Sequence, residues 1–232
     1  MDSRQIIAAM ELSAAAYRDI QPLVAEEKLA EINSETTGVQ CFLRRRGDLL
    51  KVTFRGTDSM RDWRTDFKFW RRTIPYDNQA TKIRVHTGFI NAYKAQGVRD
   101  VIQAAVAEGV RRISIAGHSY GAALAVLCAV DLEYNFPNRD LEVFLFGCPR
   151  VGNRAFQESY DRRVFKTLRI ENGNDIVTHV PLALWGYRHV GSKLHVGKPR
   201  LPFILSVKAH HPNAYYAAIL NALLPKLPYA PN

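Results

Sequence analysis

Short apolar runs alternate along the chain with longer segments in which apolar residues recur at helical spacing. The clearest run is Ile113–Ala116, whose β-branched and small apolar residues predict a fully buried strand. A glycine-flanked stretch at 117–121 follows it, and then Ala122–Leu132, where Ala, Leu and Val predict a buried helix. The rest of the chain is organised around this strand, turn and helix.

Other apolar runs predict further strands, at Val39–Arg45, Leu49–Arg55, Leu141–Phe146 and Val164–Ile170. The first two are joined by Arg46-Gly47-Asp48, which has the residue types of a hairpin turn. Tyr187–Val196 is expected to form a late antiparallel hairpin around Gly191.

Helical spacing predicts helices at Gln5–Tyr17, from Phe89 to about Val106, at Arg154–Asp161 and at Asn213–Leu224. The polar segment Gln21–Thr37 predicts the end of a helix and a loop. Strands that alternate with helices predict an α/β fold, with a mostly parallel central sheet and helices on both faces. The 232 residues show no repeat or linker and are expected to form one domain over residues 1–232.

Composition narrows the function classes. The formal net charge is +10, but the basic residues are scattered and match no nucleic-acid-binding motif. We therefore expect no nucleic-acid partner, and attraction to anionic interfaces instead. The three cysteines have no metal-ligand spacing and are expected to be buried core residues.

The N-terminal stretch Met1–Gln5 has no basic region followed by an apolar run, so no signal peptide is predicted. No apolar run is long enough to span a bilayer. The expected localisation is cytoplasmic, or outside the cell by a route that the sequence does not reveal.

Ser119 stands in Gly117-His118-Ser119-Tyr120-Gly121, between the predicted strand and the predicted helix. This order is typical of a nucleophile elbow, a turn so sharp that larger side chains two positions either side of the serine would collide. The turn presents the hydroxyl at a helix N-terminus, whose partial positive charge favours a developing oxyanion. The alternative interpretation is a glycine-rich turn in which Ser119 caps the helix.

A serine nucleophile needs a base and an acid that orients it, and in α/β-hydrolases these follow the serine in the order acid, then histidine. Asp175 is the favoured acid because it follows the end of a predicted strand, although an Asx-turn is its structural alternative. The candidate bases are His179, His189, His195, His210 and His211. Position favours His210, since His211 directly precedes Pro212 and suits a helix N-cap.

The segment Asp58–Trp70 has a second pattern of interest. Its Met60, Trp63, Phe67 and Trp70 recur at three- and four-residue steps and share one predicted helical face, opposite Arg61, Arg64 and Lys68. Such a face either covers a binding groove or belongs to the core.

Five stretches of the chain resemble the class 3, or fungal-type, lipase family of the α/β-hydrolases. They are Val52–Thr57, Val85–Phe89, Ile115–Gly121, Phe146–Asn153 and Asn174–Val177, in the family's order. The resemblance implies an α/β-hydrolase fold and a serine carboxylic ester hydrolase, a lipase or esterase that acts on acylglycerols or similar lipid esters through an acyl-serine intermediate. A phospholipase or acyltransferase on the same triad is the alternative among enzymes, and a non-catalytic membrane-surface module the alternative outside them.

By the same resemblance, Ser119 is the nucleophile, Asp175 the orienting acid and His210 the base. The family's histidine stands five positions before a tyrosine of the last helix, here Tyr215. The same count from the next tyrosine selects His211.

The resemblance also implies an oxyanion hole formed by Thr57 and by the backbone N–H of Tyr120. It makes 59–70 a candidate lid helix, with substrate contacts at Met60, Trp63, Phe67 and Trp70. No cofactor or metal is implied. The expected partners are a lipid or small ester substrate and, transiently, a lipid interface.

Overall fold

A central sheet dominates the computed structural model, which describes residues 1–19, 21–22, 27–56, 71–73, 82–95, 97–107, 109–198 and 204–224. Within these residues the sheet has seven strands, in the spatial order β1 (Lys28–Asn33), β2 (Gln40–Arg46), β3 (Leu49–Phe54), β6 (Arg112–His118), β7 (Asp140–Phe146), β9 (Thr167–Asn172) and β11 (Ser192–Val196). The strands β1 to β3 are antiparallel, and those from β3 to β11 are parallel. The predicted mostly parallel sheet is therefore confirmed.

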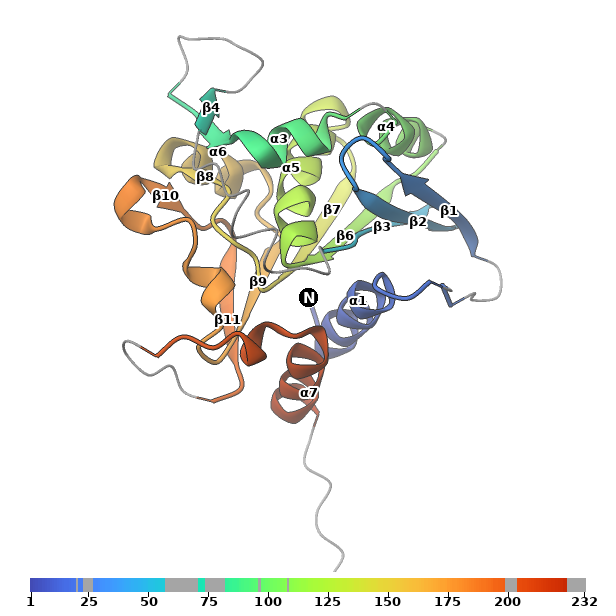
Figure 1. The fold of residues 1–232 in the computed structure, drawn as a ribbon. Helices are drawn as coiled ribbons and strands as arrows, with labels where there is room; N and C mark the ends of the chain where they lie inside the picture. The colour runs from blue at the N-terminus through green and yellow to red at the C-terminus, as the bar shows by residue number, and fades with distance from the viewer. Residues whose placement is uncertain are drawn as a thin grey trace, which may run out of the picture.

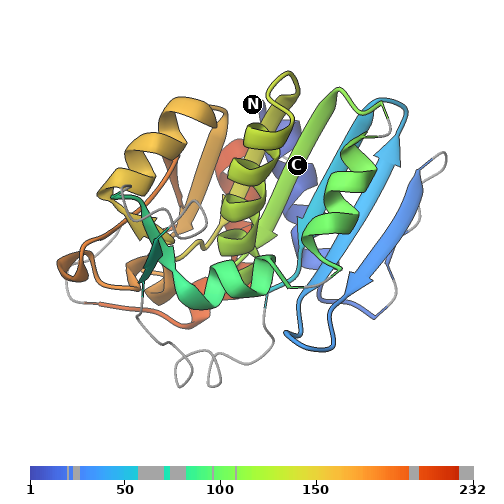
Figure 2. The same cartoon turned by 90° about the horizontal axis from the view of Figure 1, so that it is seen from above.

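Helices cover both faces of the sheet (Figure 1). One face carries α1 (Ser3–Ala15) and α7 (Pro212–Leu223), and the other carries α3 (Thr87–Tyr93), α4 (Arg99–Ala107), α5 (Tyr120–Asn135) and α6 (Arg154–Arg163). Seen from above, α5 lies over the centre of the sheet, between α4 and α6 (Figure 2). This layering confirms the predicted α/β architecture.

The alternation of side chains along the strands produces a separate core on each face. In β7, Val143 and Leu145 belong to the core beneath α5, whereas Phe144 and Phe146 belong to the core with α1 and α7. Successive strand residues point to opposite faces, so a strand covered on both sides is apolar throughout. This is why the apolar runs identified these strands in the sequence.

A small antiparallel sheet lies beside the α5 face, in the order β10 (Tyr187–Arg188), β8 (Gly152–Asn153), β5 (Arg84–His86) and β4 (Arg71–Thr73). Three short 3₁₀ helices occur in the described later part of the chain: η1 (Ile176–His179), η2 (Ala183–Trp185) and η3 (Lys208–His210). The first follows the end of β9, the third includes His210, and both belong to the site described below.

Three expectations from the sequence are wrong. The segment expected to be a helix end and a loop contains strand β1, which pairs with β2 through Ile32 and Cys41. An edge strand buries few side chains, so its apolar period is weak. The helix expected to run to Val106 is two helices, α3 and α4, with Gly97 at a φ of 86° between them.

The late hairpin does not form. Instead, β10 pairs with β8, and β11 lies parallel to β9, with Leu194 opposite Ile170. Alternating apolar residues fit a strand in either setting, so the pattern cannot identify the partner. Among the described residues, no helix has the length and apolar character that crossing a bilayer requires.

The cysteines are core residues, as expected. Cys41, Cys128 and Cys148 are all buried thiols, and burial raises the pKa of Cys148 to about 12. In the part of the chain that the structure describes, no group of three or more His, Cys, Asp or Glu side chains is placed to hold a metal ion.

Candidate active site

Ser119 occupies the turn between β6 and α5, in a strained conformation. Its φ of 60° and ψ of −125° make it the one non-glycine residue with positive φ among those described, a conformation that costs about 1–3 kcal/mol. Its N–H donates to the carbonyl of Phe146, 2.9 Å away at the end of β7, which ties the turn to the sheet. Ser119 is the N-cap residue of α5 by position, but its side chain makes no capping hydrogen bond to the helix.

The two glycines of the elbow allow close backbone contacts. A Cβ on Gly117 would overlap the carbonyl of Gly121, and a Cβ on Gly121 would overlap the carbonyls of Phe54 and Arg55. The end of β3 therefore lies directly against the start of α5. A larger residue at 117 would push the start of α5 away from β6, and a larger residue at 121 would push it away from the end of β3.

The structure brings Ser119, His210 and Asp175 into one hydrogen-bonded line. The Ser119 hydroxyl lies 2.7 Å from Nε2 of His210, and Nδ1 of His210 lies 2.8 Å from Oδ2 of Asp175. All three side chains are buried. A carboxylate accepts hydrogen bonds, so the proton of the neutral imidazole is on Nδ1 and Nε2 accepts from the serine hydroxyl.

Both carboxylate oxygens of Asp175 are engaged. The N–H of Val177 donates to Oδ1 (2.8 Å), and the hydroxyl of Tyr215 donates to Oδ2 (2.6 Å), alongside the bond from His210. The Tyr215 hydroxyl also accepts from the N–H of Asn172 (3.1 Å). The short-range bond to Oδ1 matches the Asx-turn interpretation, while Oδ2 faces the imidazole. One carboxylate thus both shapes its loop and orients the histidine.

The other candidate histidines have different partners. His211 is the N-cap of α7, where its Nδ1 accepts from the N–H of Asn213 (3.3 Å). The remaining three donate to main-chain carbonyls: His179 to Asp175 (2.9 Å), His189 to Thr178 (2.8 Å) and His195 to Lys198 (3.0 Å). Of the five candidates, the structure places His210 beside Ser119.

Arg150, which was not predicted to be a site residue, holds the loop after Asp175. Its guanidinium donates to the carbonyls of His179 and Pro181, the latter at 2.8 Å. The Thr178 hydroxyl adds a bond to the carbonyl of Asp175 (2.9 Å). Arg150 lies in Phe146–Asn153, one of the stretches that resemble the family, and this motif was the one sequence feature that could have indicated its role. Its role was hidden because its partners are carbonyls that any residue carries.

The segment that leads to His210 is joined to the loop of Asp175 by backbone bonds. The N–H of Ser206 donates to the carbonyl of Asn174 (2.8 Å), and the N–H of Ile176 donates to the carbonyl of Ser206 (3.3 Å). These bonds form a parallel bridge between Asp175 and Ser206. The acid and the histidine therefore sit on two segments that are connected locally.

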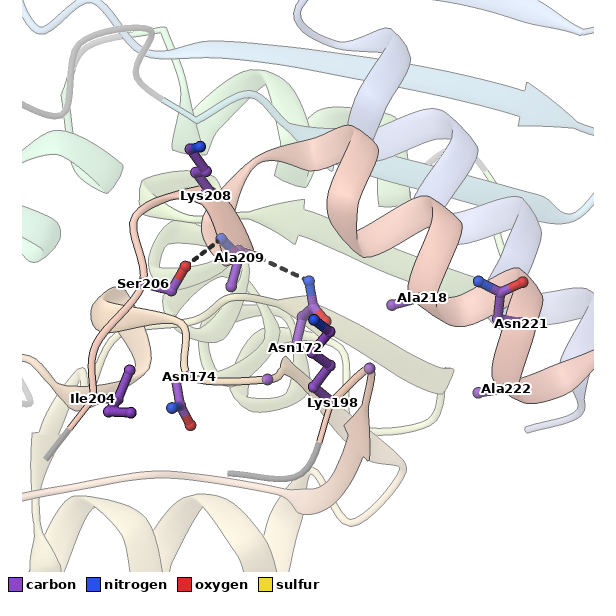
Figure 3. Close-up of a pocket in the computed structure, with 12 residues that line it drawn as sticks. Asn172, Asn174, Lys198, Ile204, Ser206, Lys208, Ala209, Ala218, Asn221 and Ala222 are labelled. Atoms are coloured by element: carbon purple, nitrogen blue, oxygen red, sulfur yellow. Dashed lines mark hydrogen bonds between the residues drawn. The ribbon is translucent and has the colours of Figure 1, made fainter. Parts of the chain in front are cut away.

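The turn η3 is held by two further bonds to Ala209, the residue before His210 (Figure 3). The Ala209 N–H donates to Oγ of Ser206 (3.1 Å), and Nδ2 of Asn172 donates to the Ala209 carbonyl (2.9 Å). A cavity of about 740 Å³ lies beside these contacts, and Asn174 and Lys208 are among its lining residues drawn in Figure 3. The triad residues are not part of that lining.

Tyr120 is the first residue of α5, directly after Ser119. The first N–H groups of a helix have no acceptor within the helix, so this one suits a hydrogen bond to a ligand oxygen. Its ring meets that of Phe89 edge-on, with centroids 5.7 Å apart. Several predicted site residues lie outside the described residues, namely Thr57 and the lid segment 59–70 with Met60, Trp63, Phe67 and Trp70.

Comparison with known proteins agrees with this geometry. A sequence model of the family described as Lipase (class 3) matches residues 51–185, more than half of the chain. The lipase of Rhizomucor miehei is 33% identical over 159 residues, 64% of this chain and 42% of that protein. A chloroplastic/mitochondrial phospholipase A(1) of Oryza sativa subsp. indica is 32% identical over 222 residues, 80% of this chain and 50% of that protein. The chain thus spans half or less of these two relatives.

Among solved structures, the lipase from Rhizopus microsporus var. chinensis matches with a TM-score of 0.70 and 28% sequence identity. The match covers 94% of this chain and 85% of that one. It confirms the α/β-hydrolase fold, and the family match confirms the resemblance found in the motifs. The chain therefore belongs to the class 3 lipase family.

Proposed function

We propose that the protein is a serine carboxylic ester hydrolase that cleaves lipid esters through an acyl intermediate on Ser119. One observation carries the proposal: the line from Ser119 Oγ through His210 to Asp175, with separations of 2.7 and 2.8 Å. A strained serine costs stability, and a buried imidazole bonded to its hydroxyl is what makes serine a nucleophile. A module that merely binds membranes gains nothing from this arrangement.

In the first half of the reaction, Ser119 Oγ attacks the ester carbonyl carbon while its proton passes to Nε2 of His210. Asp175 keeps the other imidazole proton on Nδ1 and stabilises the imidazolium. The tetrahedral intermediate then loses the bond to the alcohol oxygen, and His210 returns the proton to that oxygen. The alcohol leaves, and the acyl group stays on Ser119.

In the second half, water takes the place of the alcohol. His210 accepts a proton from water as the water oxygen attacks the acyl carbon, and then returns this proton to Ser119 Oγ as the acyl bond breaks. The N–H of Tyr120 and Thr57 stabilise the oxyanion in both halves, each contributing about 3 kcal/mol. The products are a carboxylic acid and an alcohol, and every proton is moved by the chain's own groups.

The segment that precedes His210 has an exposed apolar surface that could contact the acyl group of a substrate. Ile204, Leu205 and Val207 are 53, 53 and 52% exposed on the segment that enters η3. Exposed apolar side chains gathered in one segment are typical of surfaces that contact apolar ligands or membranes. The names of the relatives above, a lipase and a phospholipase A(1), also support a glycerolipid ester as the substrate.

An anionic lipid interface is the partner that fits the charge. Residues 176–232, which follow Asp175, contain six Lys or Arg and no Asp or Glu. A positive surface beside an apolar one favours a membrane or droplet with negative headgroups. The predicted lid helix at 59–70 belongs to this proposal and lies outside the described residues.

A phospholipase is the second candidate, favoured by the phospholipase A(1) of rice among the relatives. Both candidates use the same three side chains and the same acyl intermediate. They differ in the alcohol that leaves, because a phospholipid carries a charged headgroup on the glycerol. Rates on triacylglycerol and on phosphatidylcholine dispersions of equal acyl chain separate them.

Initial rates on p-nitrophenyl esters from acetate to stearate test the proposal. Rates should rise with acyl length, and a fluorophosphonate probe should label Ser119. Ser119→Ala should lower the rate about a thousandfold or more and abolish labelling, with an unchanged circular dichroism spectrum. A folded Ser119→Ala protein that keeps wild-type turnover would refute the proposal.

A further inference from the structure

His118, the residue before the elbow serine, contacts His210 but takes no part in the proton transfers above. Its ring stacks on that of His210, with centroids 4.6 Å apart and planes inclined by 30°. Its Nε2 lies 2.8 Å from the main-chain oxygen of His210, and its Nδ1 lies 2.8 Å from the hydroxyl of Tyr17. The side chain is buried. His118 therefore touches both the backbone and the ring of the proposed base.

These two hydrogen bonds determine where His118 carries its proton. A carbonyl oxygen is an acceptor, so Nε2 carries the proton and donates to His210. In a neutral imidazole Nδ1 is then an acceptor, and the Tyr17 hydroxyl donates to it. Burial, with repulsion from His210 when that ring is protonated, holds the pKa of His118 well below its usual range. Neutral His118 protonated on Nε2 therefore satisfies both of its hydrogen bonds, to the His210 carbonyl and to the Tyr17 hydroxyl.

Tyr17 is itself held in place at the end of the N-terminal helix segment. Its hydroxyl occupies the space above Gly56, where a Cβ would overlap it. The guanidinium carbon of Arg55 lies 5.8 Å from the centroid of its ring. Its ring meets that of His118 edge-on, with centroids 5.8 Å apart and planes at 67°. Tyr17 therefore links the end of β3 to His118.

We propose that Tyr17 and His118 are positioning residues for His210. Tyr17 holds the His118 ring through Nδ1, and His118 then fixes the peptide and the ring of His210, so that Nε2 of His210 stays on the serine hydroxyl. A neutral His118 also matters because His210 becomes an imidazolium during turnover, and a second positive ring stacked on it would oppose that charge. The inference rests on the proposed function, since it takes His210 as the base.

Two substitutions of His118 test this role. His118→Leu removes both the N–H donor and the stacked ring, and should lower kcat about tenfold to a hundredfold with little change in KM, because a small displacement of a base is costly. His118→Gln can still donate to the His210 carbonyl and should recover much of that loss. His195→Leu is the matched control, because His195 also donates to a main-chain carbonyl but lies on the exposed part of β11.

Tyr17→Phe tests the hydrogen bond that holds the His118 ring. Loss of the donor should lower kcat about threefold to tenfold, since one hydrogen bond is removed. The ¹⁵N shift of His118 Nδ1 should change because Nδ1 loses its donor, while Nε2 stays protonated and bonded to the His210 carbonyl. Tyr216→Phe is the control, because it removes a tyrosine hydroxyl bonded to Glu11 (3.0 Å), away from His118.

All rates are expressed per active site, counted by titration with a p-nitrophenyl phosphonate, so that partly unfolded variants are not mistaken for slow ones. Wild-type kcat per titrated site in His118→Leu and Tyr17→Phe would overturn the inference and leave the proposed function standing. Failure of the proposed function has a different signature, namely a wild-type protein that neither cleaves esters nor reacts with the phosphonate.

Discussion

Gly147 leaves no room for a side chain beside His210. A Cβ on Gly147 would stand 2.9 Å from Cε1 of His210 and 3.0 Å from Oδ2 of Asp175, closer than the atoms of a side chain normally approach. Gly147 follows β7 with a φ of 58°. The residue after this strand must therefore be glycine both for its backbone and for the room it leaves to the acid and the histidine.

Gly147→Ala is expected to lower kcat by at least about tenfold, because the methyl group pushes the imidazole or the carboxylate out of line. Gly173→Ala is the matched control: its φ is 50°, and the nearest atom to its Cβ is the carbonyl oxygen of Lys198, 3.8 Å away. Both variants should lose about 1 kcal/mol of stability, since both place a side chain at positive φ. Esterase assays measure the activities, and thermal melts measure the stabilities. Equal activities in the two variants would show that the site has room for a methyl group at position 147.

Ser119→Gly should unfold at a higher temperature than Ser119→Ala. Glycine adopts a φ of 60° without steric cost, whereas alanine keeps the strain of the serine. The expected gain of about 1 kcal/mol corresponds to about 2–4 °C in Tm for a chain of this length. Calorimetry measures it, and both variants should be inactive. Identical melting temperatures would mean that the turn stores no strain.

Tyr215→Phe should lower kcat about tenfold, because Asp175 loses the donor that lies 2.6 Å from Oδ2 and is freer to turn away from His210. The N–H of Asn172 loses its acceptor as well, so a small loss of stability should accompany it. Tyr216→Phe, one position further along α7, is the control and should keep full activity. Stopped assays of ester hydrolysis at saturating substrate give kcat directly, and equal values for the two variants would remove Tyr215 from the site.

Stability should fall at mildly acidic pH. Burial is the main cause that lowers the pKa of three histidines among the described residues, His86 to about 4, and His118 and His189 well below the usual range. Between the folded and the unfolded pKa, the unfolded chain binds protons that the folded chain does not. The free energy of unfolding should therefore fall as the pH drops below about 6.5, by up to about 1.4 kcal/mol per pH unit for each histidine.

Urea unfolding at several pH values measures this slope. His86→Gln should make it shallower by about one proton, whatever its effect on stability at neutral pH. A free energy of unfolding that stays constant from pH 7 to pH 4.5 would contradict the presence of buried neutral histidines.

The elements that sequence predicts best are those whose cause is local. The elbow follows from five consecutive residues, and the strands of the central sheet from unbroken apolar runs such as Leu141–Phe146. Asp175 could be predicted as the acid of the triad because an acidic residue just after a buried strand has few structural roles. In each case the local structure is determined by residues that are close together in the sequence.

The failures have a cause at long range. Tyr187–Val196 alternates like a hairpin, yet β11 pairs with β9 and β10 pairs with β8, partners that the alternation does not specify. Arg150 and His118 were missed for a related reason. Arg150 donates to the main-chain carbonyl of His179, and His118 donates to that of His210. Every residue has such a carbonyl, so the sequence does not show which one will be the acceptor.

The packing of α1 against α7 has a consequence for how the molecule is made. Ile6 and Met10 of the first helix share one core with Tyr215 and Ile219 of the last described helix (Figure 1). During synthesis α1 leaves the ribosome about 200 residues before its partner, and contacts so distant in the chain are slow to form. The hydrogen bonds that join Tyr17 and His210 to His118 are expected to form at the same late stage of folding, when α1 packs against α7. In refolding, hydrolytic activity should therefore return after helical content has already been regained.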